Sequence, residues 1–242
     1  MNRGIYSAAI GMAAAQRQLD VLSNNLANSS TTGYKRDELV FNDMFAREIQ
    51  RPGVRGAGVG SLSYGPTNFS EQTVTGELGE VRPTGNPLDV AITSQAGFFA
   101  VRSADGQVRY TRDGSFARNS EGLLVTQRGE PVLDEQLAEI SVADGRPEVL
   151  DNGTVQVDGS EVGKLGIFDG QLRKAGANLF EGSPRLTDEF TLKPGALEGS
   201  NVNVIREMTE MISLNRTFEI SQRSIMSQDD LSQRLIQSLQ DR

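Results

Sequence analysis

Four aspartates, Asp89, Asp105, Asp113 and Asp134, are the side chains of this sequence that most resemble parts of an active site. Two carboxylates that face each other about 5–10 Å apart can hydrolyse a glycosidic bond. However, Asp105 and Asp113 each precede a glycine, and Asp-Gly is typical of hairpin turns, where aspartate bonds to the local backbone. Asp89 begins a predicted strand in N-P-L-D-V-A-I, where a structural hydrogen bond is expected. We therefore predict no catalytic residue and no enzyme activity.

The side chains that usually hold metals or move protons are missing from the 242 residues, which contain no cysteine and no histidine. This composition excludes thiolate and imidazole ligands, thiol nucleophiles and the usual general base. The glycine-rich stretch G-V-R-G-A-G-V-G lacks the Lys-Ser/Thr and the preceding strand of a phosphate-binding loop. No EF-hand spacing is present either. The sequence predicts no metal site, no cofactor and no small-molecule substrate.

The net charge of −8 is unevenly distributed along the chain. Residues 1–40 carry four cations and three anions, and residues 200–242 carry five cations and six anions. Neutral ends can lie side by side without long-range repulsion, while the acidic middle stays solvated. Because no block of lysine and arginine occurs, nucleic acid and anionic lipid are not expected partners.

The opening M-N-R-G-I-Y-S-A-A-I-G-M-A-A-A-Q has a cation, a mild apolar stretch and small residues, as a secretory signal peptide does. The same helical pattern continues past the supposed cleavage site, which favours an uncleaved helix. No apolar run in the sequence approaches the roughly 20 residues of a membrane span.

Both ends of the chain repeat apolar residues every seven positions, as the helices of a coiled coil do. The first segment has one column of Ile5, Met12, Leu19 and Leu26 and a second of Ala8, Ala15 and Leu22. The last segment has one column of Val204, Met211, Phe218, Ile225 and Leu239, and its companion column begins with Met208 and ends with Ile236. These columns predict a first helix that ends near Asn28 and a last helix from Val204 to Leu239.

The ordinary interpretation of such helices is a pair of core helices in a small bundle. Here the two helices stand at opposite termini, and the chain between them is not helical. Narrow apolar columns bury little by themselves, and the companion column of the last helix is polar in its middle. We therefore expect the helices to contact copies of the same protein, to be poorly ordered in the monomer and to fold on polymerisation.

The middle of the chain has the pattern of short strands separated by tight turns. Asp-Gly and Asn-Gly are the strongest short hairpin signals, and they occur at 105–106, 113–114, 144–145, 152–153, 158–159 and 169–170. Strands are predicted at Leu88–Thr93, Gly97–Arg102, Gln107–Thr111, Leu123–Thr126, Thr154–Val157 and Val162–Phe168. Spacing of this kind is typical of a β-barrel or β-sandwich.

The predicted fold class is α+β, in which the terminal helices form a coiled-coil-like stalk and a mainly-β, barrel- or sandwich-like domain lies between them. Arg51–Thr75 is too rich in glycine for a helix or a central strand and predicts an extended arm, and Phe41–Gln50 is a candidate short helix before it. The predicted boundaries are 1–50 for the N-terminal helical segment, 51–80 for the connector, 81–190 for the β domain, 191–199 for the return connector and 200–242 for the C-terminal helix.

The stretch from Asn24 to Arg36, N-N-L-A-N-S-S-T-T-G-Y-K-R, resembles the signature of the bacterial flagellar rod and hook proteins. That signature is an Asn-Leu-Ala-Asn core followed by threonine, glycine, an aromatic and a basic residue. Three further blocks are similar to the same family: G-N-P-L-D-V-A-I-T-S-Q-A-G-F-F-A-V, Y-T-R-D-G-S-F-A-R-N-S-E-G-L-L-V-T and G-A-L-E-G-S-N-V-N-V-I-R-E-M-T-E-M-I-S-L-N-R-T-F-E. The poorest match is about Asp134–Glu189. Within the family, the opening and the G-A-L-E-G-S-N-V-N segment look most like proximal rod members, with distal rod members next.

The resemblance implies a structural subunit of the flagellar basal-body rod, exported by the flagellar type III apparatus without a cleaved signal peptide. Such a subunit stacks helically and transmits torque. The implied partners are copies of itself, other rod proteins, the export apparatus and the rings that surround the rod, in the periplasmic space or cell-wall region. A hook or junction protein of the same family is one alternative. A β-rich carbohydrate-binding or carboxylate-based hydrolytic protein with helical dimerisation ends is another.

The signature also suggests how the segment after the first helix contacts neighbouring subunits. Asparagine amides can bond to backbone and partners from both ends, and Gly33 can adopt a left-handed turn. Tyr34 can insert as an anchor, with Lys35 beside it to pair with a carboxylate on a neighbour. The predicted assembly interface contains Ile5, Met12, Leu19, Leu22, Asn24, Asn25, Leu26, Asn28, Gly33, Tyr34, Lys35, Val204, Met208, Met211, Phe218, Ile225 and Leu239.

Overall fold

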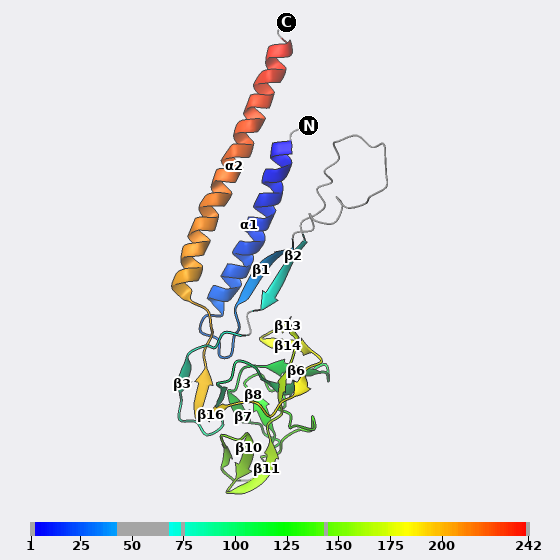
Figure 1. Ribbon diagram of the computed structural model, residues 1–242, viewed down its shortest axis with the longest axis vertical. Helices are drawn as coiled ribbons and strands as arrows, with labels where there is room; N and C mark the ends of the chain where they lie inside the picture. Colours follow the sequence, from blue (N-terminus) through cyan, green and yellow to red (C-terminus); the bar gives the residue numbers. More distant parts are fainter. Residues whose placement is uncertain (1–2, 43–67, 74–75, 143–144, 241–242) are drawn as a thin grey trace. The chain divides into compact units, whose positions relative to one another are not determined.

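The computed structural model describes residues 3–42, 68–73, 76–142 and 145–240 and shows an α+β protein with a mostly β central region (Figure 1). Contacts divide the chain into two units. The helical unit contains the described residues of 1–24, 37–72 and 205–242, and the β unit contains those of 25–36 and 73–204. The short segment 25–36, which begins in the last turn of the first helix, therefore belongs with the β strands; we call it the elbow.

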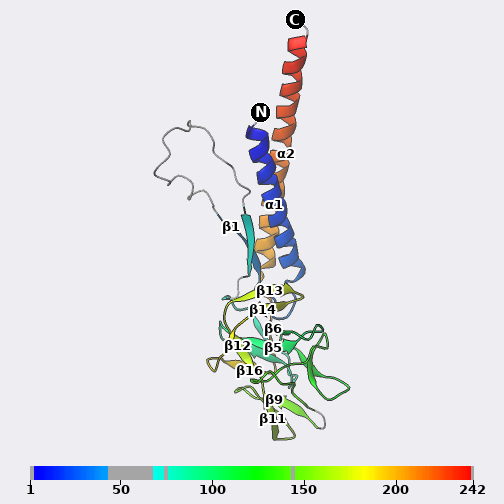
Figure 2. The ribbon, with the colours of Figure 1, turned by 90° about the vertical axis from the view of Figure 1, so that its right-hand side faces the viewer.

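Two helices and one strand pair make up the helical unit. Helix α1 (Arg3–Ala27) and helix α2 (Val204–Gln240) run side by side in both ribbon views (Figures 1 and 2). The Gln18 amide donates to Glu210 Oε1 across them at 2.9 Å. Strands β1 (Asp37–Asn42) and β2 (Asn68–Thr73) pair with each other. Both predicted helices are confirmed, because α1 ends next to Asn28 and α2 begins at Val204.

The end of α1 has a local cause. The backbone N–H of Asn28 bonds to Asn25 O at 3.1 Å and that of Ser29 to Leu26 O at 3.2 Å, so the final turn tightens to three-residue spacing. The Ser29 hydroxyl also donates to Leu26 O at 2.8 Å. Polar side chains that bond to the backbone in this way compete with continued helix, and they satisfy carbonyls that a helix end leaves free.

The apolar columns of the two helices are buried to different extents. On α1, Ala15 and Leu22 of the second column are buried together with Val21, which lies in neither predicted column. Met12 and Leu19 of the first column are half-buried. On α2, Met211, Phe218 and Ile225 are half-buried, whereas Val204 and Met208 are exposed. The side chains of Ile5 and Leu239 lie outside the described part of the chain.

A six-stranded sheet is the largest element of the β unit, with strand order β13-β14-β6-β5-β12-β15. Its strands are β5 (Phe98–Arg102), β6 (Val108–Thr111), β12 (Ile167–Asp169), β13 (Leu172–Gly176), β14 (Leu179–Gly182) and β15 (Arg185–Leu186). A three-stranded sheet has the order β11-β10-β9, with β9 (Pro147–Val149), β10 (Thr154–Val157) and β11 (Ser160–Lys164). Three two-stranded pairs complete the unit: β16 (Leu192–Pro194) with β4 (Val90–Ile92), β17 (Ala196–Glu198) with β3 (Val81–Pro83), and β7 (Phe116–Arg118) with β8 (Leu124–Thr126).

Strand β5 is buried on both faces, which places it at the centre of the β unit. Because successive side chains point to opposite faces of a strand, Phe99 lies in the larger apolar cluster and Phe98 in the smaller one. Phe99 meets Phe116 edge-on at 5.1 Å between ring centres, and Phe98 meets Phe180 at 5.0 Å. The core therefore covers both sides of the sheet from which the site described below is built.

Most of the predicted strands are confirmed within one or two residues, including β10, whose bounds match. Val162–Phe168 was predicted as one strand but is broken, because Leu165 and Gly166 separate β11 from β12. A Cβ on Gly166 would lie 2.4 Å from Asp134 O, so a second chain segment passes directly against the backbone there. Asp113-Gly114 and Asp169-Gly170 were predicted as hairpin turns but join β6 to β7 and β12 to β13, and neither of these pairs of strands is hydrogen-bonded.

The connectors also differ from the prediction where they are described. The return segment Thr191–Gly199 contains the strands β16 and β17, each paired with a strand from the other end of the β unit. The last part of the predicted extended arm forms β2. Phe41 and Asn42, at the start of the candidate short helix, are the end of β1. Residues 43–67, which include the rest of both segments, lie outside the described residues.

Candidate functional site

The elbow, residues 25–36, contains the residues that the sequence singled out, and the structure places most of their side chains inside the β unit. Asn25, Gly33, Tyr34 and Lys35 are buried, and Asn28 is half-buried. The expectation was that Tyr34 and Lys35 contact neighbouring subunits. In the structure, both side chains are enclosed by residues of their own chain.

Gly33 lets the elbow approach the backbone that follows β6. Its φ of 64° lies in the left-handed region, which glycine adopts without strain. A Cβ at this position would lie 2.5 Å from Arg112 C and from Asp113 N, which are backbone atoms and cannot rotate away. Its N–H donates to Glu198 O at 2.8 Å. No other residue type fits this position without moving the elbow or the turn after β6.

Tyr34 is held at both ends of its side chain. Its hydroxyl donates to Asn25 Oδ1 at 3.1 Å, so the tyrosine spans the elbow back to the last turn of α1. The Lys174 ammonium, from β13, lies 3.8 Å from the centre of the ring, in position for a cation–π contact. The same ammonium donates to Lys35 O at 3.1 Å. Strand β13 thereby fixes the ring and the backbone that follows it.

The turn between β13 and β14 contacts the elbow a second time. Asn178, with φ of 62°, donates from its side-chain amide to Thr32 O at 2.9 Å. Its own carbonyl accepts from the Thr111 hydroxyl at 3.2 Å, which ties the turn to β6. The hairpin of β13 and β14 therefore supplies both a charged and a neutral contact to the elbow.

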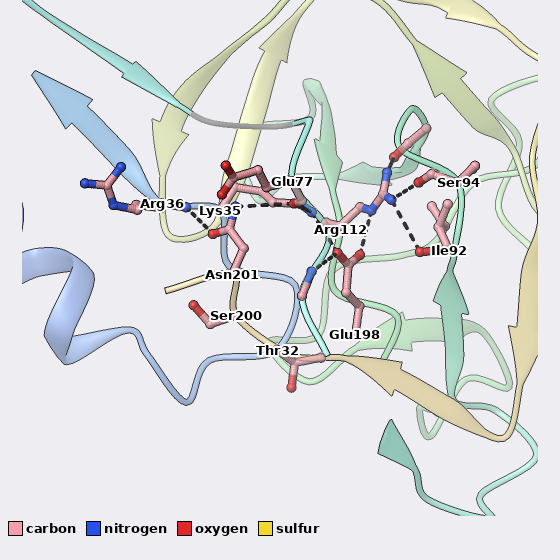
Figure 3. Close-up of polar contacts among 12 residues, drawn as sticks. Thr32, Lys35, Arg36, Glu77, Ile92, Ser94, Arg112, Glu198, Ser200 and Asn201 are labelled. Atoms are coloured by element: carbon pink, nitrogen blue, oxygen red, sulfur yellow. Dashed lines mark hydrogen bonds and ion pairs between the residues drawn. The ribbon is translucent and has the colours of Figure 1, made fainter. Parts of the chain in front are cut away.

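Three buried charged side chains meet where the elbow joins the β unit: Lys35, Arg112 and Glu198, which we call the elbow cluster (Figure 3). Lys35 Nζ lies 2.7 Å from Glu198 Oε1, and Arg112 Nε lies 2.7 Å from Glu198 Oε2. The N–H of Gly79 donates to the first of these oxygens at 3.0 Å. One carboxylate therefore accepts from three chain segments that are distant in sequence.

The two cations also donate to backbone carbonyl oxygens. Lys35 Nζ donates to Glu77 O at 2.8 Å. The Arg112 guanidinium donates to Gly97 O, Ser94 O and Ile92 O, in the loop between β4 and β5, and lies 5.7 Å from the centre of the Phe98 ring. A buried charge is tolerated only when it is paired and hydrogen-bonded. These bonds therefore hold the Arg112 side chain in place, and Arg112 in turn fixes the backbone of this loop.

The elbow cluster buries two cations against one carboxylate. Burial lowers the pKa of the Lys35 ammonium below its ordinary value of 10.5, although the charge and hydrogen bond of Glu198 oppose that effect. The neighbouring positive charge of Arg112 lowers the pKa further. Burial therefore disfavours the charged form of Lys35, and the contact with Glu198 is what keeps the ammonium in the interior.

The two segments that leave the β unit here are bonded to each other. The N–H of Arg36 donates to Asn201 Oδ1 at 2.7 Å, and the Asn201 side-chain amide donates to Glu77 O at 3.3 Å (Figure 3). The N–H of Asn201 bonds in turn to Tyr34 O at 3.4 Å. Asn201 thus joins the elbow to the segment that leads into α2.

The four aspartates have structural roles, as the sequence predicts for Asp89. That residue accepts from the Thr84 hydroxyl at 2.6 Å and from the Asn86 amide at 2.8 Å. Asp105, Asp113 and Asp134 each accept backbone N–H groups two residues further on. Among the described residues, no group of three or more acidic side chains is arranged to hold a metal ion. Neither described helix is long and apolar enough to cross a membrane.

Arg112 and Glu198 were missed as site residues, although both lie in blocks quoted above, Y-T-R-D-G and G-A-L-E-G-S-N. One sequence feature could have indicated Glu198 as a site residue: it is a charged residue that directly follows the apolar residues Ala196 and Leu197. Glu198 and Ala196 are both buried, so they point inward on alternate positions of β17. Nothing local reveals which cations such a carboxylate meets.

Three segments of the chain match known protein families. Residues 5–35 match the family described as flagella basal body rod protein, residues 91–162 the flagellar hook protein FlgE/F/G D1 domain, and residues 193–238 the flagellar basal body rod FlgEFG protein C-terminal region. Lys35, Arg112 and Glu198 fall one in each of these segments. The elbow cluster is thus the point where the three matched segments come together.

Relatives are similar over nearly the whole chain. Over 96% of this chain and 98% of its own length, the flagellar basal-body rod protein FlgG of Buchnera aphidicola subsp. Acyrthosiphon pisum is 33% identical. The rod protein FlgF of Caulobacter vibrioides is 31% identical over 99% of this chain and 98% of its own. FlgG of Bacillus subtilis is 31% identical over 98% of both.

Proposed function

Because the chain belongs to the flagellar basal-body rod protein family, we propose that it is a structural subunit of the bacterial flagellar rod. The observation that carries this proposal is similarity to rod proteins along nearly the full length of this chain and of the relatives. Its place is then the basal body, in the periplasmic region. The role is mechanical, since the candidate carboxylates of the described residues are used in turns rather than in a catalytic cleft.

The exposed apolar residues of α2 support assembly through the terminal helices. Ile205, Ile212, Ile220 and Met226 are 78, 56, 67 and 61% exposed. They recur at intervals of six to eight residues, so they lie along one side of the helix, next to the half-buried column of Met211, Phe218 and Ile225. Large apolar side chains gathered on one exposed face usually mark an interaction surface. We propose that neighbouring subunits cover this face and complete a coiled-coil-like stalk.

The residues of the predicted assembly interface divide between two roles in this proposal. The exposed and half-buried residues of the helices contact neighbouring subunits, and the near-neutral charge of the two termini permits them to pack closely. Leu22 is buried within its own subunit. The buried elbow residues Asn25, Gly33, Tyr34 and Lys35 act from within the subunit by fixing the chain at the end of α1. Asn24, which is exposed, stays with the first group.

The test uses a strain that lacks its own copy of the gene and is complemented with variants. Ile212→Glu places a charge in the exposed apolar face and should abolish swimming, because desolvating a carboxylate at a subunit contact is costly. Thr217→Glu, on an exposed position of α2 that faces away from these apolar residues, is the matched control and should swim. Immunoblots must show equal export of both variants. Normal swimming with Ile212→Glu would contradict the proposal that neighbouring subunits cover the apolar face of α2.

The position along the rod and the wider partners are further proposals. The proximal position suggested by the opening and by G-A-L-E-G-S-N-V-N stays a prediction, because relatives named FlgF and FlgG match at similar identity. Other rod proteins are the proposed axial neighbours, with type III export apparatus and surrounding rings as transient and lateral partners. Imaging of a basal body with this chain labelled would establish its position.

A further inference from the structure

Several of the contacts that hold the elbow come from much later parts of the chain. Gly33 and Lys35 bond to Glu198, Arg36 bonds to Asn201, and Thr32 bonds to Asn178. Each of these partners lies well over a hundred residues further on. The elbow therefore has no means of reaching its observed conformation until β14 and β17 are in place.

Glu198 is the residue on which these contacts converge. Its backbone carbonyl accepts from Gly33, and its carboxylate accepts from Lys35, Arg112 and Gly79. The side chain is fully buried, so water cannot replace a missing partner. Loss of the carboxylate charge would leave the cations Lys35 and Arg112 facing each other in the interior.

The apolar core and the buried ion pair of the β unit do not depend on residues of the elbow. None of the buried residues of its two apolar clusters belongs to residues 25–36. Arg112 and Glu198 form a pair of zero net charge, and the other donors of Arg112 are satisfied by the loop between β4 and β5. If the elbow moved away, this ion pair and both apolar clusters would keep all of their members.

We propose that Glu198 is a latch that closes the elbow onto the β unit only when the chain is complete through β17, and that the elbow can open as one piece while the β unit stays folded. Closing the latch fixes the last turn of α1, because Tyr34 bonds to Asn25. The latch is a device within one chain. It does not depend on the proposed role in the rod, and its test is independent of assembly.

Hydrogen exchange of the intact purified chain, followed by mass spectrometry, tests the latch. Elbow amides such as those of Gly33 and Arg36 report opening, and peptides covering β5 and β6 report the β unit. Glu198→Gln keeps the shape of the side chain and removes its charge. Elbow exchange should become faster on the order of tenfold or more, because hydrogen bonds to a charged group are roughly twice as strong as neutral ones. Exchange of β5 and β6 should accelerate much less than that of the elbow, although Arg112 also loses its charged partner in this variant.

The control for the charge is Glu181→Gln, since Glu181 also accepts from two cations, Arg109 and Arg173, but at the surface. This variant should leave elbow exchange unaltered. If Glu198→Gln leaves elbow exchange as slow as the wild type, the latch is overturned. Equal acceleration of the elbow and of β5 and β6 would also overturn it, because the elbow would then not open separately.

A second variant approaches the latch from the elbow side. Gly33→Ala places a Cβ against the Arg112 backbone and leaves every charge in position. It should accelerate elbow exchange without affecting β5 and β6. Gly106→Ala is the matched control, since Gly106 has a similar φ of +81° but nothing within 4 Å of an added Cβ. If Gly33→Ala and Gly106→Ala give the same elbow exchange, the elbow is not closed by this contact and the proposal fails.

Discussion

Lys35 and Glu198 are 163 residues apart in the chain, and their side chains meet at 2.7 Å in the interior of the β unit. The exposed fractions of the two side chains are 1% and 0%. Glu198 shares its second carboxylate oxygen with Arg112. One buried carboxylate thus connects the segment after α1, the strand before α2 and the centre of the β unit.

Arg112 should matter far more to stability than an arginine on the surface. Arg112→Met should lower the free energy of unfolding by about 3–5 kcal/mol, because it removes one of the two cations bound to Glu198 and leaves three carbonyl oxygens without their donor. Arg82→Met is the control, since Arg82 pairs with Glu80 on the solvent-exposed surface. This variant should lower the free energy of unfolding by less than about 1 kcal/mol. Urea denaturation followed by circular dichroism measures both. Similar losses for the two variants would contradict the structural role of Arg112.

Tyr34 and Lys174 should be energetically coupled through the ring contact at 3.8 Å. A double-mutant cycle with Tyr34→Leu, Lys174→Met and the double variant should give a coupling free energy of about 0.5–2 kcal/mol. Each single variant is measured by urea denaturation under the same conditions. Additive losses would mean that the ammonium and the ring lie together without stabilising each other.

The stability of the β unit should depend on pH through Asp113. Burial raises the pKa of this carboxyl above its ordinary value of 3.8, against the hydrogen bonds from Ser115 and the charge of Arg128, while Asp89 adds to the increase. The folded chain then binds this proton more tightly than the unfolded chain does. Its contribution is fully present below about pH 4 and is lost as the pH rises through the folded pKa.

Asp113→Asn should flatten that part of the pH profile. Asparagine keeps the oxygen that accepts from the N–H and hydroxyl of Ser115, at 3.0 and 2.6 Å, and cannot ionise. Urea midpoints of the wild type and the variant should therefore differ in their slope with pH from about pH 4 upward. Parallel profiles would show that Asp113 titrates as an ordinary carboxyl.

The terminal helices should gain order on assembly. Ile205, Ile212 and Ile220 are largely exposed on α2, and a helix with an uncovered apolar face draws little stability from its own chain. Circular dichroism of dilute monomer should show much less helix than the assembled protein. Full-length, stable helices in a dilute monomer would argue strongly against polymerisation-coupled folding.

Much of the architecture could be predicted from local patterns. The seven-residue columns located α1 and α2, the Asp-Gly and Asn-Gly turns located several hairpins, and Asn28 with Ser29 marked the end of α1. The predicted strand Val162–Phe168 failed because it is broken where Asp134 passes against Gly166, a contact between distant segments. The missed strands β16 and β17 likewise pair with the far end of the β unit.

The site also combines features that local sequence patterns predict with features that depend on contacts between distant segments. The sequence singled out the glycine, the tyrosine and the lysine of the elbow through their resemblance to a family signature, because residue type alone is equally typical of an ordinary polar turn. Only the tertiary structure decided that these side chains turn inward, because Glu198 and Arg112 reach Lys35 through strand pairing across the whole chain. Helix period and turn preference are properties of neighbouring residues. The partner of a buried charge depends on which strands meet, and that is fixed only when the chain has folded.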